Sequence, residues 1–202
     1  MCTQVSKSTE EDWIKLTRLL GYLNGTIDMV RTISVKNLDE MKSWADASYA
    51  IHDDMKGHTG GTTSFRVGVI HTMCSKQKLN TKSSTESKLV GINDMMPMVL
   101  RVRYFLTAQG CHVKDNVLYQ DNMSTMKLAN NGKMSSGRRT RHLNIRYFFV
   151  ADRISKGEMR IEHCPTEKML ADFYTKPLQV SFSDLQGSDF ERSAYQDWIR
   201  QA

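Results

Sequence analysis

The sequence of 202 residues lacks long hydrophobic runs and paired cysteines. No apolar run approaches the ~20 residues that cross a bilayer, and residues 1–7 lack the apolar core of a secretory signal. The four cysteines stand singly, with no Cys-x-x-Cys pair, so neither a zinc site nor a disulfide framework is indicated. We therefore expect an intracellular protein, cytoplasmic or nuclear, that is neither secreted nor bound to a membrane.

Positive charge exceeds negative charge by a small margin. The chain has 28 Lys and Arg against 22 Asp and Glu, a formal charge of +6. This excess is compatible with a polyanionic partner, although a mildly basic soluble protein explains the total nearly as well. The placement is more informative, because five basic residues fall within a short stretch: Arg138, Arg139, Arg141, His142 and Arg146. This cluster favours contacts with phosphates.

The order of the expected elements indicates an α/β fold. Helical spacing of apolar residues predicts a first helix over 11–25, followed by a strand over 44–51 and a glycine-containing turn over 52–61. The elements expected after this turn are strands at 65–70 and 71–79, a helix at 83–106, a strand at 117–120, helices at 124–130 and 143–155, a strand at 159–164 and a helix at 166–176. Pro97 should kink or split the long helix. The order βββαβααβα predicts a five-stranded mixed sheet flanked by helices.

Four acidic residues lie on an expected strand, at the start of an expected helix, just past the end of a strand and on the last expected helix: Asp46, Glu86, Asp121 and Asp172, respectively. Ligands of such sheets gather beyond the carboxyl ends of parallel strands. Carboxylates that converge there repel one another unless a cation lies among them, and Mg²⁺ prefers oxygen ligands. Hydrolysis of a phosphodiester by two metal ions requires such a cluster.

Each acid also has an ordinary structural explanation. Glu86 lies three residues after Ser83, which is the spacing of a helix capping box. Asp121 with Asn122 fits a turn or a helix N-cap, Asp172 fits a solvated helix position, and Asp46 fits the edge of a strand. The set of four, rather than any single member, favours the metal site.

Several motifs occur in an order that identifies a known family. They are WADAS at 44–48, GHTGG at 57–61, SKQK at 75–78, SSTES at 83–87, YQDN at 119–122, RHLNIRY at 141–147, CPTE at 164–167, LAD at 170–172 and TKPL at 175–178. Together they make residues 43–178 resemble the ribonuclease H domain of copia-type LTR retrotransposon Pol polyproteins. The helix at 11–25 resembles the segment that joins reverse transcriptase to this domain. The resemblance divides the chain into a connection at 1–40, a ribonuclease H-like domain at 41–178 and a tail at 179–202, and it implies a truncated polyprotein.

The resemblance implies a Mg²⁺-dependent endoribonuclease that hydrolyses the RNA strand of RNA–DNA hybrids. Asp46, Glu86, Asp121 and Asp172 correspond to the four metal-binding acids, which hold two Mg²⁺ ions or Mn²⁺ in their place. Recognition of the hybrid would use its 2′-hydroxyls, with contacts from Ser84, Asn122 and the basic cluster of Arg138, Arg139, Arg141, His142 and Arg146. The ancestral partners would be the reverse transcriptase and integrase of the same polyprotein.

Two residues depart from the family pattern. Lys88 stands where the family usually carries an acid, and Asn144 replaces a common aspartate. Neither is one of the four metal-binding acids, so these departures would affect the efficiency of catalysis more than its mechanism. The implied truncation leaves a second function open, a catalytically silent Pol remnant that at most binds nucleic acid. An integrase or transposase of the same superfold is rejected because its glutamate comes last among the catalytic acids, whereas Glu86 comes second. His163 is expected in the last strand as a packed or surface residue, and His52 and His58 as members of an ordinary loop.

Overall fold

The computed structural model describes residues 7–28, 30, 33–35, 38–131 and 141–175. The chain divides into two compact units, residues 1–32 and residues 33–202. None of the described helices combines the length and the hydropathy that crossing a membrane requires.

The first unit contains one helix, α1 (Glu10–Gly25). Its N-cap, Thr9, accepts a hydrogen bond from the backbone of Asp12, whose carboxylate bonds back to the amide of Thr9, so a complete capping box starts the helix. None of its residues is buried. The predicted helix at 11–25 is confirmed.

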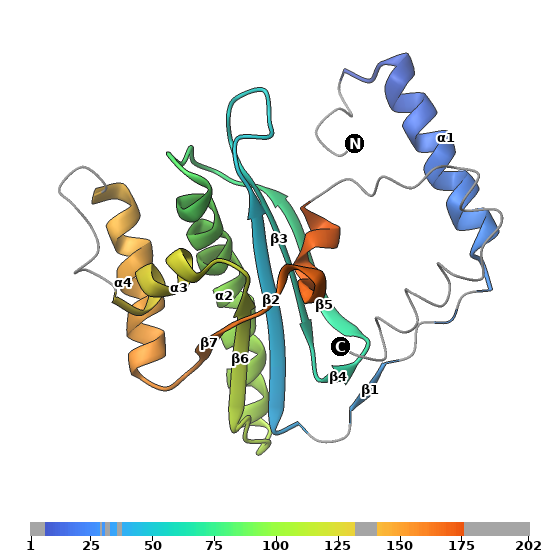
Figure 1. Cartoon of the computed structure of the whole chain (residues 1–202). Helices are drawn as coiled ribbons and strands as arrows, with labels where there is room; N and C mark the ends of the chain where they lie inside the picture. The colour runs from blue at the N-terminus through green and yellow to red at the C-terminus, as the bar shows by residue number, and fades with distance from the viewer. Residues whose placement is uncertain (1–6, 29, 31–32, 36–37, 132–140, 176–202) are drawn as a thin grey trace. The chain divides into compact units, whose positions relative to one another are not determined.

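The second unit is built on a five-stranded sheet with the order β5-β3-β2-β6-β7 (Figure 1). The strands are β2 (Glu40–Ser48), β3 (His58–Ser64), β5 (Val69–Lys76), β6 (Asp115–Gln120) and β7 (Arg160–His163). β3 pairs antiparallel with β2 and β5, while β6 pairs parallel with β2 and β7. The short strands β1 (Ser34–Val35) and β4 (Arg66–Val67) pair with each other. The mixed five-stranded sheet confirms the predicted fold class, which is the ribonuclease H-like arrangement.

Two hydrophobic clusters cover the two faces of this sheet. The larger one joins α2 (Ser84–Ala108), α3 (Met123–Asn131) and α4 (Arg141–Ser155) to the strands, with Ala45 and Leu89 fully buried in it. The smaller one joins Trp44 to the 3₁₀ helix η4 (Leu170–Tyr174). Because neighbouring strand residues point to opposite faces, Trp44 and Ala45 assign the two clusters to opposite sides of β2. Figure 1 shows α2 and η4 on different sides of this central strand.

Glycine accounts for the main difference from the predicted strands. The segment expected to be a turn at 52–61 supplies most of β3, and the expected strand at 65–70 is instead the irregular junction of β4 and β5. A Cβ on Gly60 would lie 2.6 Å from Cγ2 of Thr175, and one on Gly61 would lie 2.8 Å from Sδ of Met95. Both glycines therefore permit close packing inside a strand, whereas composition alone favours a turn for them.

Two expected helices also differ in detail. The last one, predicted at 166–176, is a pair of short 3₁₀ helices, η3 (Thr166–Lys168) and η4, separated by Met169 in an extended conformation with ψ 92°. The long helix α2 runs through Pro97 as one element and is not split. The helices predicted at 124–130 and 143–155 and the strands predicted at 117–120 and 159–164 are confirmed as α3, α4, β6 and β7.

Candidate active site

The candidate site lies where two parallel neighbours, β2 and β6, stop pairing. Their last paired residues are Trp44 and Tyr119, but β2 continues to Ser48. Buried Gln120 fills the gap, because its amide nitrogen donates to the carbonyl of Ala45 at 2.9 Å. Its side-chain oxygen accepts the backbone N–H groups of Asp121 at 3.0 Å and of Asn122 at 3.2 Å. This neutral clamp holds Asp121 beside the last residues of β2, which pair with β3 but not with β6.

A lysine occupies the space between the two aspartates. Nζ of Lys88, on the second turn of α2, lies 2.9 Å from Oδ1 of Asp46 and 2.5 and 2.7 Å from the two carboxylate oxygens of Asp121. The three side chains are only 15%, 2% and 11% exposed, respectively. One ammonium group therefore neutralises part of a largely buried pair of carboxylates.

The electrostatics of this cluster favour its charged form. Desolvation raises the pKa of Asp46, but the charge of Lys88 and hydrogen bonds from Lys88 and Thr175 outweigh it, so that the pKa is lowered. Desolvation lowers the pKa of Lys88, while the hydrogen bond to Asp121 and the charge of Asp46 raise it, and the net shift is upward. The cluster is accordingly a buried ion triad, in which removal of the lysine leaves two carboxylates without a compensating charge.

Asp172 reaches the same region through Thr175. The Thr175 hydroxyl donates to Oδ2 of Asp46 at 2.7 Å and lies 3.4 Å from the backbone oxygen of Asp172. The carbonyl of Thr175 accepts the hydroxyl of Ser48 at 2.8 Å, which fixes the end of η4 against the end of β2. The structure thus brings the elements that carry Asp46, Asp121 and Asp172 together.

Glu86 faces another way. Its carboxylate accepts the backbone N–H of Lys82 at 2.8 Å, while its own N–H donates to the N-cap Ser83 at 3.2 Å. These bonds form the local helix-start arrangement that the spacing of Ser83 and Glu86 indicates. The position of α2 that faces both aspartates is 88 rather than 86. A metal-binding role for Glu86 stays a prediction.

The predicted nucleic-acid contacts are placed unequally. Ser84 is exposed, and Oδ1 of Asn122 accepts the N–H of Thr125 at 2.9 Å, which caps the start of α3. Arg146 is partly buried, and its charge acts against the desolvation that raises the pKa of Asp94. Arg141 and His142 are the first two residues of α4. Arg138 and Arg139 lie outside the described residues.

No group of three or more His, Cys, Asp or Glu side chains arranged to hold a metal ion occurs within the described residues. His52 and His58 form a row with Cys74 instead. Nε2 of His52 lies 3.2 Å from Nδ1 of His58, and Nε2 of His58 lies 3.2 Å from Sγ of Cys74. Both ring nitrogens of His58 are engaged by neighbours, so this row is no metal site. His163 ends β7 and is exposed, as its expected strand position allows.

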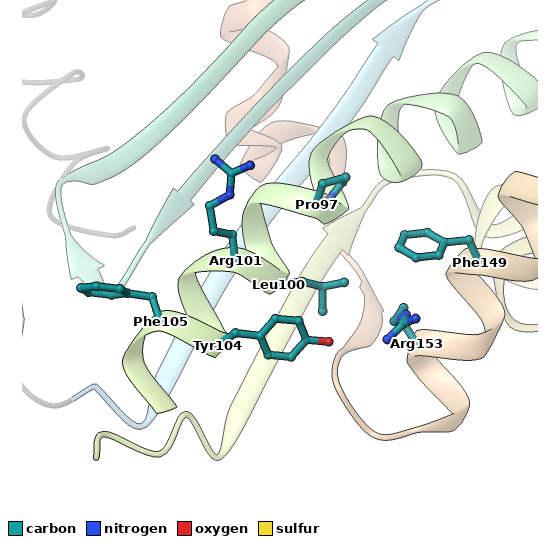
Figure 2. A pocket seen from close by; sticks show the side chains of 7 residues that line it. All are labelled: Pro97, Leu100, Arg101, Tyr104, Phe105, Phe149 and Arg153. Atoms are coloured by element: carbon teal, nitrogen blue, oxygen red, sulfur yellow. The ribbon is translucent and has the colours of Figure 1, made fainter. Parts of the chain in front are cut away.

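A separate pocket of about 660 Å³ lies between α2 and α4 (Figure 2). Figure 2 shows the Tyr104 hydroxyl directed toward Arg153, whose guanidinium lies 5.1 Å from the centre of the Phe149 ring. Pro97, the nearest lining residue in sequence, is nine positions beyond Lys88 on the same helix, or roughly 13 Å along its axis. The pocket therefore belongs to the helical layer and not to the carboxylate cluster.

Sequence comparison relates the chain to retrotransposon polyproteins. It is 29% identical over 179 residues to the retrovirus-related Pol polyprotein from transposon RE2 of Arabidopsis thaliana, a match that covers 87% of this chain. It is 30% identical over 172 residues, or 84% of this chain, to the corresponding polyprotein from transposon RE1 of the same plant. The chain spans 12% of the length of each of these relatives. No profile of a known protein family matches the chain.

Structural comparison gives only distant likenesses. The crystal structure of LC11-RNase H1 in complex with an RNA/DNA hybrid has a TM-score of 0.47 and 8% identity, over 66% of this chain and 91% of that one. The native prototype foamy virus protease-reverse transcriptase also has a TM-score of 0.47, at 12% identity, over 85% of this chain and 22% of that one. TM-scores below 0.5 are too low to assign the fold. The fold assignment rests instead on the order and register of the strands in the sheet.

Proposed function

We propose, from the premise that this chain is a relative of the copia-type Pol polyproteins and has a ribonuclease H-like fold, that it is a retrotransposon-derived ribonuclease H-type domain. Its nucleic-acid ligand is an RNA–DNA hybrid. The observation that carries the proposal is the placement of Asp46 and Asp121 at the carboxyl ends of two adjacent parallel strands, around one shared cation. The Thr175 hydroxyl contacts both Oδ2 of Asp46 and the backbone oxygen of Asp172, so the segment that carries Asp172 lies beside the cluster.

The reaction class of such a centre is metal-assisted hydrolysis of the RNA strand. In such a centre the carboxylates would hold two Mg²⁺ or Mn²⁺ ions, and the ions would supply activation of water and stabilisation of the leaving oxygen. The donor set of this chain has the right chemistry, since hard cations prefer carboxylate oxygens. The arrangement does not fit the ions, however, because Nζ of Lys88 already lies 2.5 to 2.9 Å from the oxygens that would hold them. We assign no catalytic step to metal ions in this chain.

Lys88 therefore favours the second of the two candidate functions, a domain that binds the hybrid and cleaves it slowly or not at all. Binding and cleavage respond differently to charge. A lysine in the cluster opposes metal ions at the reacting phosphate, but contacts with the backbone and 2′-hydroxyls of the hybrid do not depend on those ions. We propose hybrid binding with strongly reduced hydrolysis as the activity of this chain, in the intracellular location that its sequence predicts.

A cleavage assay with a labelled RNA strand tests this proposal. The wild type, Lys88→Glu, Asp121→Asn and the double variant are compared in Mg²⁺ and in Mn²⁺. We expect little cleavage by the wild type, cleavage by Lys88→Glu, and loss of that gain in the double variant. Cleavage by the wild type as fast as by Lys88→Glu, and abolished by Asp121→Asn, would show an active nuclease. Equal cleavage by all four proteins would indicate a contaminant.

Binding is measured separately by fluorescence anisotropy in EDTA, with an RNA–DNA hybrid, duplex DNA and duplex RNA of one sequence. The proposal requires the hybrid to bind more tightly than both duplexes, at a stated salt concentration because phosphate contacts weaken as salt rises. Equal affinity for all three would leave only nonspecific attraction to a polyanion and would contradict a hybrid-binding function.

A further inference from the structure

We propose that the ammonium group of Lys88 takes the place of a divalent cation and closes the carboxylate cluster to metal ions. This inference deepens the proposed function and rests on it for the identity of the site. It concerns the cluster itself, and its test does not require nucleic acid or turnover.

The first argument is geometric. A cation bound by Asp46 and Asp121 would have to approach oxygens of both carboxylates at 2.0–2.1 Å for Mg²⁺. Nζ of Lys88 contacts the same carboxylates at 2.5 to 2.9 Å. The ammonium group and a metal ion cannot occupy this space together, and two cations so close would repel each other.

The second argument concerns the other partners of the cluster. Oδ2 of Asp46 accepts the Thr175 hydroxyl at 2.7 Å, so a neutral donor from the residue that follows η4 also engages this carboxylate. The backbone of Asp46 packs against α2, where a Cβ on Gly91 would lie 3.1 Å from the Asp46 carbonyl. Strand and helix therefore lie close together near the lysine, which keeps position 88 beside the Asp46 carboxylate.

The third argument is the balance of charge. Asp46 is 2% exposed and Asp121 is 11% exposed, which makes an unpaired pair of carboxylates costly. In a metal site of this kind, the carboxylates repel one another when the ion is absent. Lys88 removes that dependence, because the compensating charge is part of the chain. The domain should therefore fold without divalent ions, and removal of Lys88 should make its stability depend on metal ions.

The test measures metal binding directly. Manganese binding to the complete chain is followed by the electron paramagnetic resonance signal of free Mn²⁺, and thermal unfolding is recorded in EDTA and in Mn²⁺ or Mg²⁺. The wild type is compared with Lys88→Met and Lys88→Glu. Lys76→Met is the matched control, because Lys76 pairs with Asp54 at 2.8 Å on an exposed part of the surface.

We expect the wild type and Lys76→Met to keep the same Tm with and without metal. Lys88→Glu should bind Mn²⁺ at least about tenfold more tightly than the wild type, and Mn²⁺ should raise its Tm by roughly 5 °C or more. Lys88→Met should show a smaller gain of the same sign. If Lys88→Glu is unfolded in EDTA, its refolding on addition of Mn²⁺ is the supporting result, and Lys88→Met provides the folded comparison.

Several results would overturn the inference. The first is a wild-type affinity for Mn²⁺ within about twofold of that of Lys88→Glu. The second is that neither Lys88 variant binds Mn²⁺ more tightly than the wild type. The third is that Lys88→Glu keeps its tighter Mn²⁺ binding when Asp121→Asn is added. The last result would place the metal outside this cluster. Failure of hybrid binding in the anisotropy assay would contradict the proposed function and leave the metal measurement unchanged, so the two failures are distinguishable.

Discussion

The two ends of β6 carry ion pairs of contrasting kinds. At the amino end, Arg160 makes two hydrogen bonds of 2.7 Å to Asp115, with the two side chains 49% and 39% exposed. At the carboxyl end, Lys88 joins Asp121 and Asp46 in a cluster that is mostly excluded from water. The exposed pair has the better geometry, since an arginine fork matches a carboxylate, yet the buried cluster should control stability and function. Solvent exposure, rather than the quality of the contact, separates the two.

The largest effect should come from Lys88→Met, which leaves two buried carboxylates without a counter-ion. We expect a loss of about 3 kcal/mol in the free energy of unfolding, measured by urea denaturation in EDTA. Lys88→Gln should lose a similar amount, because an uncharged amide also fails to compensate the charge. A loss below that of an exposed ion pair would contradict a buried, compensating role for this lysine.

The next effect should come from Gly60→Ala, which tests the packing of η4 on β3. The new Cβ would lie 2.8 Å from the carbonyl oxygen of Ala171 and 2.9 Å from Cβ of Tyr174, contacts that require η4 to move. We expect a loss of about 2 kcal/mol in urea denaturation. Gly21→Ala is the control, because nothing lies within 4 Å of its added Cβ in α1, and an alanine there should be neutral or stabilising.

A smaller effect should appear on acidification. The pKa of Asp46 in the folded protein is lowered from its ordinary value of 3.8, so the folded state binds fewer protons than the unfolded chain in this range. The contribution is therefore fully present above about pH 4 and is lost as the pH falls through the lower folded value. Urea midpoints measured from pH 5 to pH 3 should fall more steeply for the wild type than for Asp46→Asn. Parallel curves would contradict the shift.

The smallest effect should come from Arg160→Ala at the exposed end of β6. We expect a loss of about 0.5 kcal/mol at low salt, because exposed pairs contribute little. The difference from the wild type should shrink further in 0.5 M NaCl, where exposed charges are screened. A loss as large as that from Lys88→Met would remove the contrast between the two ends of the strand.

The sequence predicts the architecture well because its signals are local. Apolar spacing and caps define α1, α2 and α4, and the alternation of strands and helices defines the mixed sheet. Two of the errors occur where distant contacts override local preference. Gly60 and Gly61 belong to β3 because η4 and Met95 pack against them, and the expected last helix is divided at Met169, which is buried against Trp44.

The sequence predicts where in the fold the candidate site lies, but it does not predict that a lysine side chain lies between the two aspartates. The strand ends that carry Asp46 and Asp121 follow from the motifs, whereas the direction of each side chain on α2 depends on how that helix is set against the sheet. Glu86 and Lys88 are two residues apart and therefore point to different sides of the helix. The sequence showed Lys88 only as a departure from a pattern, and the roles of Gln120 and Thr175 depend on contacts between segments far apart in the chain.

The Gln120 clamp separates the shape of the site from its chemistry. An uncharged amide sets the spacing of the two strand ends through bonds to Ala45, Asp121 and Asn122, so exchanging the charge at position 88 need not rebuild the backbone. Under the proposed function, one substitution at position 88 would exchange a site filled by a lysine for a site open to metal ions while the scaffold stays the same. Loss of the charge pattern would then precede loss of the fold.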